Sequence, residues 1–354
     1  MTALECHSIR MTRDSVRRIG VGSGSPEGKN SAYLVDERVV VDPGPPDDDA
    51  WADLTDGLER ADVSLTDLEA VLVTHWHVDH AGLAPRLADA AGATLAMGAG
   101  DAPLVADYGI ERERRLERDR ETMRYWGVPA DAVERVVAGD TPSPMPESIS
   151  VERLADGDRL AGLEAVATPG HTLGHTAFAR DDALLVGDAV LPTYTPNVGG
   201  SDTRTLAPES VQSVREGGAN DGAARRTDPL ADFLETLDRL ADRSERLLPG
   251  HGTSLAADRI ETVRDHHEER SARVLEVLER RANEPAARAA ADTDETADRT
   301  GTTPWTIARD LFGDLGGSHV KFGAGEAAAH CRHLERRGLV GRRSTDPVRY
   351  VPLD

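Results

Sequence analysis

Residues 74–82 read Thr-His-Trp-His-Val-Asp-His-Ala-Gly and directly follow the apolar run Ala70–Val73. An unbroken apolar run of this length predicts a buried strand. Residues two apart in a strand point to the same side, so His75 and His77 leave the strand end together. A carboxylate and a third imidazole follow where the chain turns toward a helix. Nitrogen and oxygen ligands in this arrangement suit zinc or another borderline divalent metal.

Three later segments repeat the design, because each carries a histidine or an aspartate at or just past the end of an apolar run. Thr-Pro-Gly-His-Thr at 168–172 contains His171, the run at 183–188 ends on Asp188, and Leu-Leu-Pro-Gly-His-Gly at 247–252 contains His251. Rigid strand ends can aim such side chains into one shared cleft. The four segments together therefore supply ligands for two coordination shells.

The series His-x-His-x-Asp-His at 75–80, followed in order by His171, Asp188 and His251, resembles the motifs of the metallo-β-lactamase superfamily. The resemblance spans roughly residues 8 to 255 and includes two segments, 30–35 and 39–44, similar to the opening hairpin of that fold. It implies an α/β fold, a four-layer αββα metallo-β-lactamase sandwich.

The resemblance also implies a role for each of seven ligands. One metal would be held by His75, His77 and His171, the second by Asp79, His80 and His251, and Asp188 would bridge the two. The implied cofactor is two Zn²⁺ per chain, with iron or manganese as alternatives. A bridging hydroxide, formed because the metals lower the pKa of water to near 7, would attack the substrate. Asp79 would also orient this nucleophile, which makes it the candidate catalytic residue.

Candidate partners of the site lie in other segments. Asp42 ends a strand before Pro-Gly, and it is either a partner that orients a metal ligand or an ordinary turn residue. Tyr125 ends an Arg- and Glu-rich helix, whereas Tyr194 and Asn197 lie in the segment just after Asp188. These two tyrosines and Asn197 are the candidate substrate-binding residues; for Tyr125 the alternative is an aromatic contact that seats its helix on the core.

The composition indicates the environment more than the substrate. The chain has 354 residues, 63 acidic against 41 basic, and a formal net charge of −22, and its only lysines are Lys29 and Lys321. This acidic composition resembles that of halophilic proteins from salt-accumulating archaea, whose charged surfaces stay hydrated; an ordinary acidic cytosolic protein is the alternative. The two cysteines, Cys6 and Cys331, do not suggest a disulfide framework. With neither a membrane-length apolar run nor a signal peptide, we expect a cytoplasmic protein without membrane partners.

The chain divides into two expected domains. Residues 1–283 would form the catalytic domain, with a helical insertion at 101–133 and a mobile insertion at 201–227, and residues 284–300 would form a linker. Five short apolar runs between 134 and 190, including Val136–Ala138, predict the strands of a second sheet. His266 and His267, on a long helix, are assigned to its surface, because adjacent helical residues point about 100° apart.

Residues 301–354 are expected to form a winged-helix-like domain. Thr303 followed by Pro304 predicts a helix start, a second helix is expected at 324–337, and a two-strand wing follows. The segment is similar to the module attached to β-lactamase-like endoribonucleases. It holds eight basic and six acidic residues, a balance that hints at nucleic-acid contact. A structural lid or a homodimer contact is the alternative.

We therefore expect a metal-dependent hydrolase. A nucleophilic serine elbow, Gly-x-Ser-x-Gly, is absent. The expected substrate is a small-molecule ester or thioester, as for glyoxalase II (hydroxyacylglutathione hydrolase) or a β-lactamase-like protein 2-type enzyme, although the sequence does not identify basic residues that would bind a glutathione carboxylate. The alternative is an endoribonuclease that cleaves single-stranded RNA with help from the C-terminal domain.

Overall fold

The computed structural model describes residues 15–25, 28–208, 228–284 and 300–353. Most of the expected mobile insertion, at 209–227, and of the expected linker, at 285–299, lies outside the described residues, as do Cys6 and the rest of residues 1–14.

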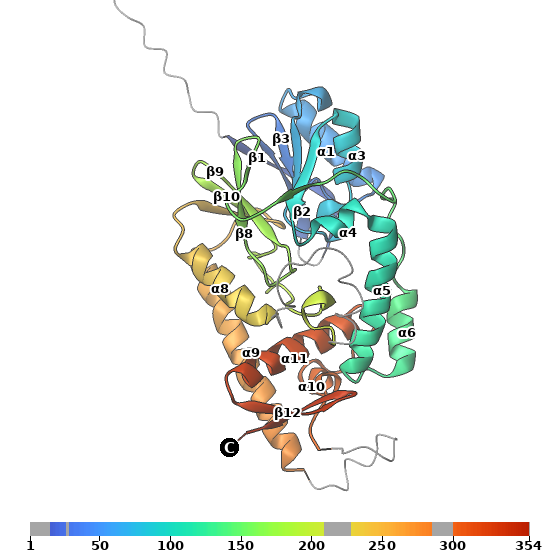
Figure 1. Cartoon of the computed structure of the whole chain (residues 1–354). Coiled ribbons are helices and arrows are strands. Elements are labelled where there is room, and N and C mark those ends of the chain that lie inside the picture. Colours follow the sequence, from blue (N-terminus) through green and yellow to red (C-terminus); the bar gives the residue numbers. More distant parts are fainter. Residues whose placement is uncertain (1–14, 26–27, 209–227, 285–299, 354) are drawn as a thin grey trace, which may run out of the picture.

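Two sheets form the centre of the molecule (Figure 1). The six-stranded sheet has the order β1 (Val16–Ser25), β2 (Gly28–Val35), β3 (Val39–Val41), β4 (Ala70–Val73), β5 (Thr94–Gly98) and β6 (Glu152–Leu154). The five-stranded sheet has the order β11 (Arg246–Pro249), β10 (Ala183–Gly187), β9 (Thr176–Arg180), β8 (Leu163–Ala167) and β7 (Arg159–Leu160). Neighbours β3 to β6 run parallel, and so do β10 and β11.

The alternation of side chains along the central strands produces the layers. In β4, Ala70 and Leu72 enter the apolar cluster between the two sheets, whereas Val71 and Val73 enter the cluster on the outer face. Helices α1 (Asp48–Arg60) and α3 (Ala84–Ala91) cover that outer face. In β10 the same alternation directs alternate residues toward α8 (Pro229–Ala241) and α9 (Arg259–Ala282). Both faces of both sheets are buried, which confirms the predicted αββα sandwich.

Three helices lie between β5 and β6 in the chain: α4 (Ala102–Ala106), α5 (Tyr108–Tyr125) and α6 (Ala130–Ala138). The strand predicted at Val136–Ala138 is wrong, because these residues end α6. Ala132, Val133, Val136 and Val137 follow the helical period and pack on one apolar cluster, which outweighs the strand preference of valine.

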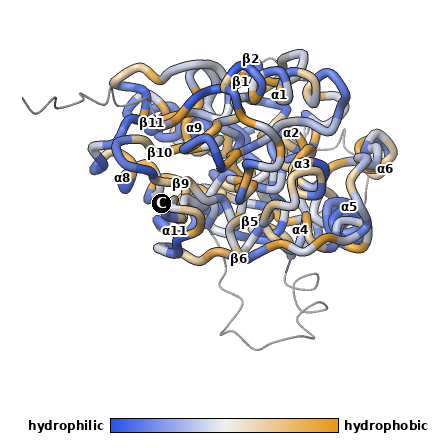
Figure 2. The backbone as a smooth tube through the Cα atoms, turned by 90° about the horizontal axis from the view of Figure 1, so that it is seen from above, coloured by the Kyte–Doolittle hydropathy of each residue, from blue (hydrophilic) through white to orange (hydrophobic). Residues whose placement is uncertain are grey.

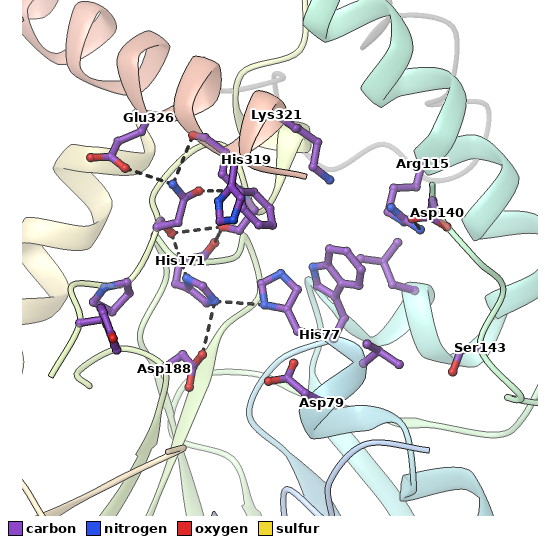
Figure 3. Close-up of a pocket in the computed structure, with 18 of the residues that line it drawn as sticks. His77, Asp79, Arg115, Asp140, Ser143, His171, Asp188, His319, Lys321 and Glu326 are labelled. Carbon is purple, nitrogen blue, oxygen red and sulfur yellow. Dashed lines mark hydrogen bonds and ion pairs between the residues drawn. The ribbon is translucent and has the colours of Figure 1, made fainter. Parts of the chain in front are cut away.

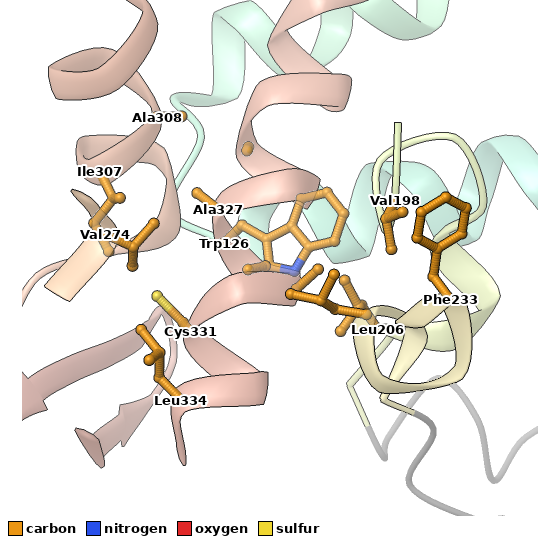
Figure 4. Close-up of a cluster of buried hydrophobic side chains, with 14 of the residues drawn as sticks. Trp126, Val198, Leu206, Phe233, Val274, Ile307, Ala308, Ala327, Cys331 and Leu334 are labelled. Atoms are coloured by element: carbon orange, nitrogen blue, oxygen red, sulfur yellow. The ribbon is translucent and has the colours of Figure 1, made fainter. Parts of the chain in front are cut away.

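The C-terminal segment contains α10 (Pro304–Phe312), α11 (His319–Arg336) and the hairpin of β12 (Val340–Thr345) and β13 (Val348–Pro352). Thr303 caps α10 as expected, since its hydroxyl accepts a hydrogen bond from the backbone N–H of Thr306 at 3.2 Å. Residues of α10, α11 and the hairpin share one apolar cluster with Trp126 and Phe233 (Figure 4).

Helix α5 is rich in charged residues. In Figure 2, where the backbone is coloured by hydropathy, α5 is predominantly hydrophilic. Within the described residues, no helix is both long enough and apolar enough to span a membrane.

His267 does not lie on the surface of α9, contrary to the sequence-based expectation. Its ring is 1 % exposed, and in the described part of the chain neither ring nitrogen has a hydrogen-bond partner. It stacks on His330 of α11, with ring centroids 5.6 Å apart, and meets the edge of Phe233 of α8. Burial, together with the nearby His266 and Arg270, lowers the pKa of His267 from 6.5 to about 3.

This burial predicts an acid-dependent loss of stability. Below about pH 6.5 the unfolded chain protonates residue 267 while the folded chain does not, so the free energy of unfolding falls by about 1.4 kcal/mol per pH unit from this group until about pH 3. His267→Leu is expected to remove this contribution. Urea unfolding at several pH values between about 4.5 and 6.5 should show a shallower slope for the variant than for the wild type. Equal slopes would show that His267 is protonated in the folded protein.

Candidate metal centre

The histidine cluster begins where β4 ends. His75 follows the strand, and His77 precedes the short helix α2 (Val78–Ala81), which carries Asp79 and His80. Asp42, just after β3, fixes this turn because it accepts hydrogen bonds from the backbone N–H and the hydroxyl of Thr74, both at 2.7 Å. The same carboxylate lies 3.0 Å from His80 Nδ1. Of the two interpretations of Asp42, the structure therefore supports the orienting partner. The pairing directs His80 Nε2 toward the cluster.

The seven expected ligands converge in two neighbouring sets. In the first, His77 Nδ1 lies 3.0 Å from His75 Nε2 and 3.1 Å from His171 Nε2. In the second, His251 Nε2 lies 3.3 Å from both Asp79 Oδ2 and His80 Nε2. Within each set, the three ligand atoms lie within 4.8 Å of one another.

Asp188 lies between the two sets, at the end of β10. Its Oδ1 is 3.4 Å from His80 Nε2 and 3.6 Å from His251 Nε2, and its Oδ2 is 3.9 Å from His171 Nε2 (Figure 3). Gly250 makes this approach possible, because a Cβ at that position would come within 2.5 Å of Asp188 Oδ1.

The donor set fits divalent cations. Donors around a tetrahedral ion with bonds of about 2.0–2.1 Å lie about 3.3 Å apart, close to the separations of the paired atoms here. Asp188 Oδ1 is buried and has no hydrogen-bond partner among the described residues, which leaves it available to a cation.

The protonation states also fit. Burial and the neighbouring His171 lower the pKa of His77 to about 3, so its nitrogen is neutral and able to ligate. Burial alone would lower the pKa of His251, but the neighbouring carboxylates of Asp188 and Asp79 raise it to about 9. Without a bound ion, the proton on His251 therefore offsets part of the negative charge of Asp79 and Asp188. A metal cation can take the place of that proton.

Two supporting residues escaped the sequence analysis. His175 stacks on His75, accepts a hydrogen bond from the Asp188 backbone N–H at 3.2 Å, and pairs with the Thr168 hydroxyl at 2.8 Å. Asp101 is fully buried and accepts hydrogen bonds from the Trp76 and Gly174 backbone N–H groups, from the Thr172 hydroxyl and from Arg204. It therefore ties the first histidine turn to the loop of His171. The repeated histidine of His-Thr-Leu-Gly-His at 171–175 was a visible signal for His175, whereas no local pattern marked Asp101.

The three candidate substrate residues lie in different environments. Tyr194 is 48 % exposed and lines the pocket above the metal ligands. Asn197 also lines the pocket, but its side-chain amide donates to Phe322 O and Glu326 of α11, and its backbone oxygen lies 2.9 Å from His171 Nδ1. Asn197 therefore orients His171 and anchors α11. Tyr125 is not among the residues that line the pocket and packs instead against the shared apolar cluster.

Comparisons with known proteins agree with this geometry. A family model described as the Metallo-beta-lactamase superfamily matches residues 25–251. The chain is 25 % identical over 260 residues to the probable metallo-hydrolase YqjP of Bacillus subtilis, and the match covers 70 % of this chain and 74 % of the relative. It is 24 % identical over 290 residues to a beta-lactamase-like protein 2 homolog of Drosophila melanogaster, covering 79 % of this chain and 74 % of that protein.

Solved structures resemble the chain over nearly its whole length. A metallo-beta-lactamase family protein from Thermus thermophilus superposes with a TM-score of 0.70 at 26 % identity, covering 96 % of this chain and 99 % of the other. A beta-lactamase domain protein from Burkholderia ambifaria superposes with a TM-score of 0.64 at 21 % identity and covers 97 % and 92 % of the two chains. The second likeness concerns the fold alone.

Proposed function

The chain belongs to the metallo-beta-lactamase superfamily, and from this premise we propose that it is a dinuclear zinc hydrolase of small esters or thioesters. The observation that carries the proposal is the position of Asp188, whose two oxygens face different sets of ligands, Oδ1 toward His80 and His251 and Oδ2 toward His171. Imidazole and carboxylate donors in this combination suit zinc.

Each residue of the site would have a defined role in hydrolysis. His75, His77 and His171 would hold one ion, and Asp79, His80 and His251 the other, with Asp188 shared. When bound, such ions supply Lewis acidity and lower the pKa of water to near 7. Asp79 Oδ2 is engaged by His251 and by the Asn30 side-chain amide at 3.2 Å, so Oδ1 is the oxygen that can orient the attacking water. Asp79 is partly exposed and lines the pocket, which gives it access to that water.

The cavity supports a small substrate. It has a volume of about 690 Å³ and is closed on one side by residues of the C-terminal segment, and this volume lies in the range that small-molecule sites occupy. The basic residues of that segment give little support to RNA binding, because several of them form ion pairs within the protein. Examples are Arg309 with Asp314, Arg336 with Asp228 and Arg342 with Glu335.

Metal analysis combined with a substrate panel tests the proposal. The purified protein is expected to contain about two zinc ions per chain, to cleave generic esters or thioesters, and to lose this activity on chelation and regain it on zinc addition. A short single-stranded RNA serves as the competing substrate. Metal-dependent cleavage of the RNA with no cleavage of any ester or thioester would overturn the assignment of substrate class.

A further inference from the structure

The pocket above the metal centre has a wall that the sandwich itself does not provide. Figure 3 shows Lys321 and His319 entering from α11 on the side opposite Asp79 and Asp188. Arg115 and Asp140 form the adjoining side, near Trp76. The C-terminal segment therefore contributes directly to the surface that a substrate meets.

Lys321 is unusual in both sequence and structure. It is one of two lysines in a chain whose other basic residues are all arginines, and it is 8 % exposed. Its Nζ lies 3.1 Å from Asp119 Oδ2, the one carboxylate that pairs with it in the described part of the chain. An ammonium group has three N–H donors. The contact with Asp119 therefore leaves Lys321 able to donate further hydrogen bonds.

The charges around Lys321 do not cancel. Asp119 also accepts a hydrogen bond from the Thr203 hydroxyl at 2.5 Å and pairs with Arg115 at 3.4 Å. Asp140 pairs with both Arg115 and Arg112 at 2.7 Å. Three cations thus share two carboxylates. The other two carboxylates that line this part of the pocket are already paired, Glu111 with Arg114 and Glu326 with Arg270.

The wall also has an apolar part. Phe312, Leu315 and Phe322 of the C-terminal segment line the pocket together with Trp76 and Leu104. A ligand that satisfies both parts carries an anionic group and an apolar portion. In a chain with a net charge of −22, a positive wall facing the metal ligands is a local feature that general surface charge does not explain.

We propose that Lys321 determines specificity by binding an anionic group, a carboxylate or a phosphate, on the ester or thioester that the metal centre cleaves. This inference rests on the proposed hydrolase function for its substrate class. The nucleophile and metal ligands come from the sandwich, whereas the anion-binding residue comes from α11, far beyond the last ligand in sequence.

Matched substrates test the role of Lys321. Thioesters that differ only in carrying a free carboxylate, a phosphate or a neutral amide are compared with wild type, Lys321→Met and Lys321→Arg. For Lys321→Met, the preference in kcat/KM for the better anionic thioester over the neutral one is expected to fall about 10- to 100-fold, mainly through KM, because a charge-assisted contact is lost. Lys321→Arg should restore part of the preference.

Two controls separate anion binding from structural damage. Lys321→Met leaves the buried Asp119 carboxylate with one cationic partner fewer. The double variant Asp119→Asn/Lys321→Met removes this carboxylate as well, and it should show the same loss of preference for the anionic thioester. Lys29→Met changes the other lysine, which pairs with Asp53 on the surface, and it should match the wild type. Equal losses on anionic and neutral thioesters would contradict the proposal.

Calorimetry on uncleavable thioether analogues keeps the two hypotheses distinct. Wild type should bind the anionic analogue at least about tenfold more tightly than the neutral one, and Lys321→Met should abolish the difference. This binding result would support the role of Lys321 even if no thioester is hydrolysed. A lack of hydrolysis would count only against the proposed function. Equal binding of the two analogues by wild type overturns the role of Lys321, whatever the turnover.

Discussion

Asp188→Ala is expected to lower kcat/KM for ester or thioester hydrolysis by about a hundred- to a thousandfold, the order of loss seen when one group that stabilises transition-state charge is removed. Asp188 is the one carboxylate with close contacts to both histidine sets, and its Oδ1 has no hydrogen-bond donor in the described part of the chain. The substitution should also reduce the metal content, because a negative ligand shared by the two sets is lost.

The fold should survive this change. Asp188 contributes a carboxylate to the centre, whereas the neighbouring Leu184 and Val186 contribute to the apolar cluster. Asp182→Ala, at an exposed position just before the same strand, is the matched control and should retain wild-type activity and metal content. Wild-type turnover by Asp188→Ala, with both metals retained, would show that the bridging assignment is wrong.

Trp126→Ala is expected to lower the free energy of unfolding by about 3–5 kcal/mol, as large-to-small substitutions of buried aromatic residues do. Trp126 is 1 % exposed and belongs to the cluster that joins α8, α9 and the C-terminal helices (Figure 4). Its backbone oxygen also accepts a hydrogen bond from the Trp305 backbone N–H at 3.1 Å. Because these elements share one core, chemical unfolding of the variant should remain a single transition, with its midpoint shifted to a lower denaturant concentration.

The matched control is Trp51→Ala. Trp51 is only partly buried, under the Arg86 guanidinium on the opposite side of the molecule, and its removal should cost clearly less. If Trp126→Ala instead split the unfolding curve so that only one part of the chain lost stability, residues 301–354 would be a separately folding domain. Intrinsic fluorescence and far-UV circular dichroism, recorded in parallel, distinguish these outcomes.

The metal ligands that follow a recognisable local pattern could be predicted from the sequence. His75, His171, Asp188 and His251 each stand at or just past the end of an apolar run, and strand ends in an α/β sandwich meet at one edge. The four layers were expected through the resemblance to the metallo-β-lactamase superfamily, because a short apolar run does not by itself distinguish a buried strand from a buried helix. The strand expected at Val136–Ala138 failed because three β-branched or small residues fit either period, and packing decided between them.

The residues that surround the ligands depended on contacts between distant parts of the chain. Asp101 reaches Thr172 across 71 positions, and Lys321 reaches Asp119 across 202. No local pattern encodes such pairs, because an aspartate or a lysine reads the same in sequence whether it is buried in an ion pair or solvated. Tyr125 illustrates the converse, since its place in the helical insertion suggested the pocket, whereas in the structure it is partly buried against the shared apolar cluster.

The amino-acid order alone was sufficient for the ligand types and their positions at the ends of apolar runs, because these follow from donor chemistry and local pattern. The layered architecture was expected through the family resemblance. The shape and charge of the pocket were settled by folding. Residues of the C-terminal helices line the pocket beside the metal ligands, and the apolar faces of these helices pack in the cluster that they share with α8 and α9. This packing brings Lys321 to the pocket.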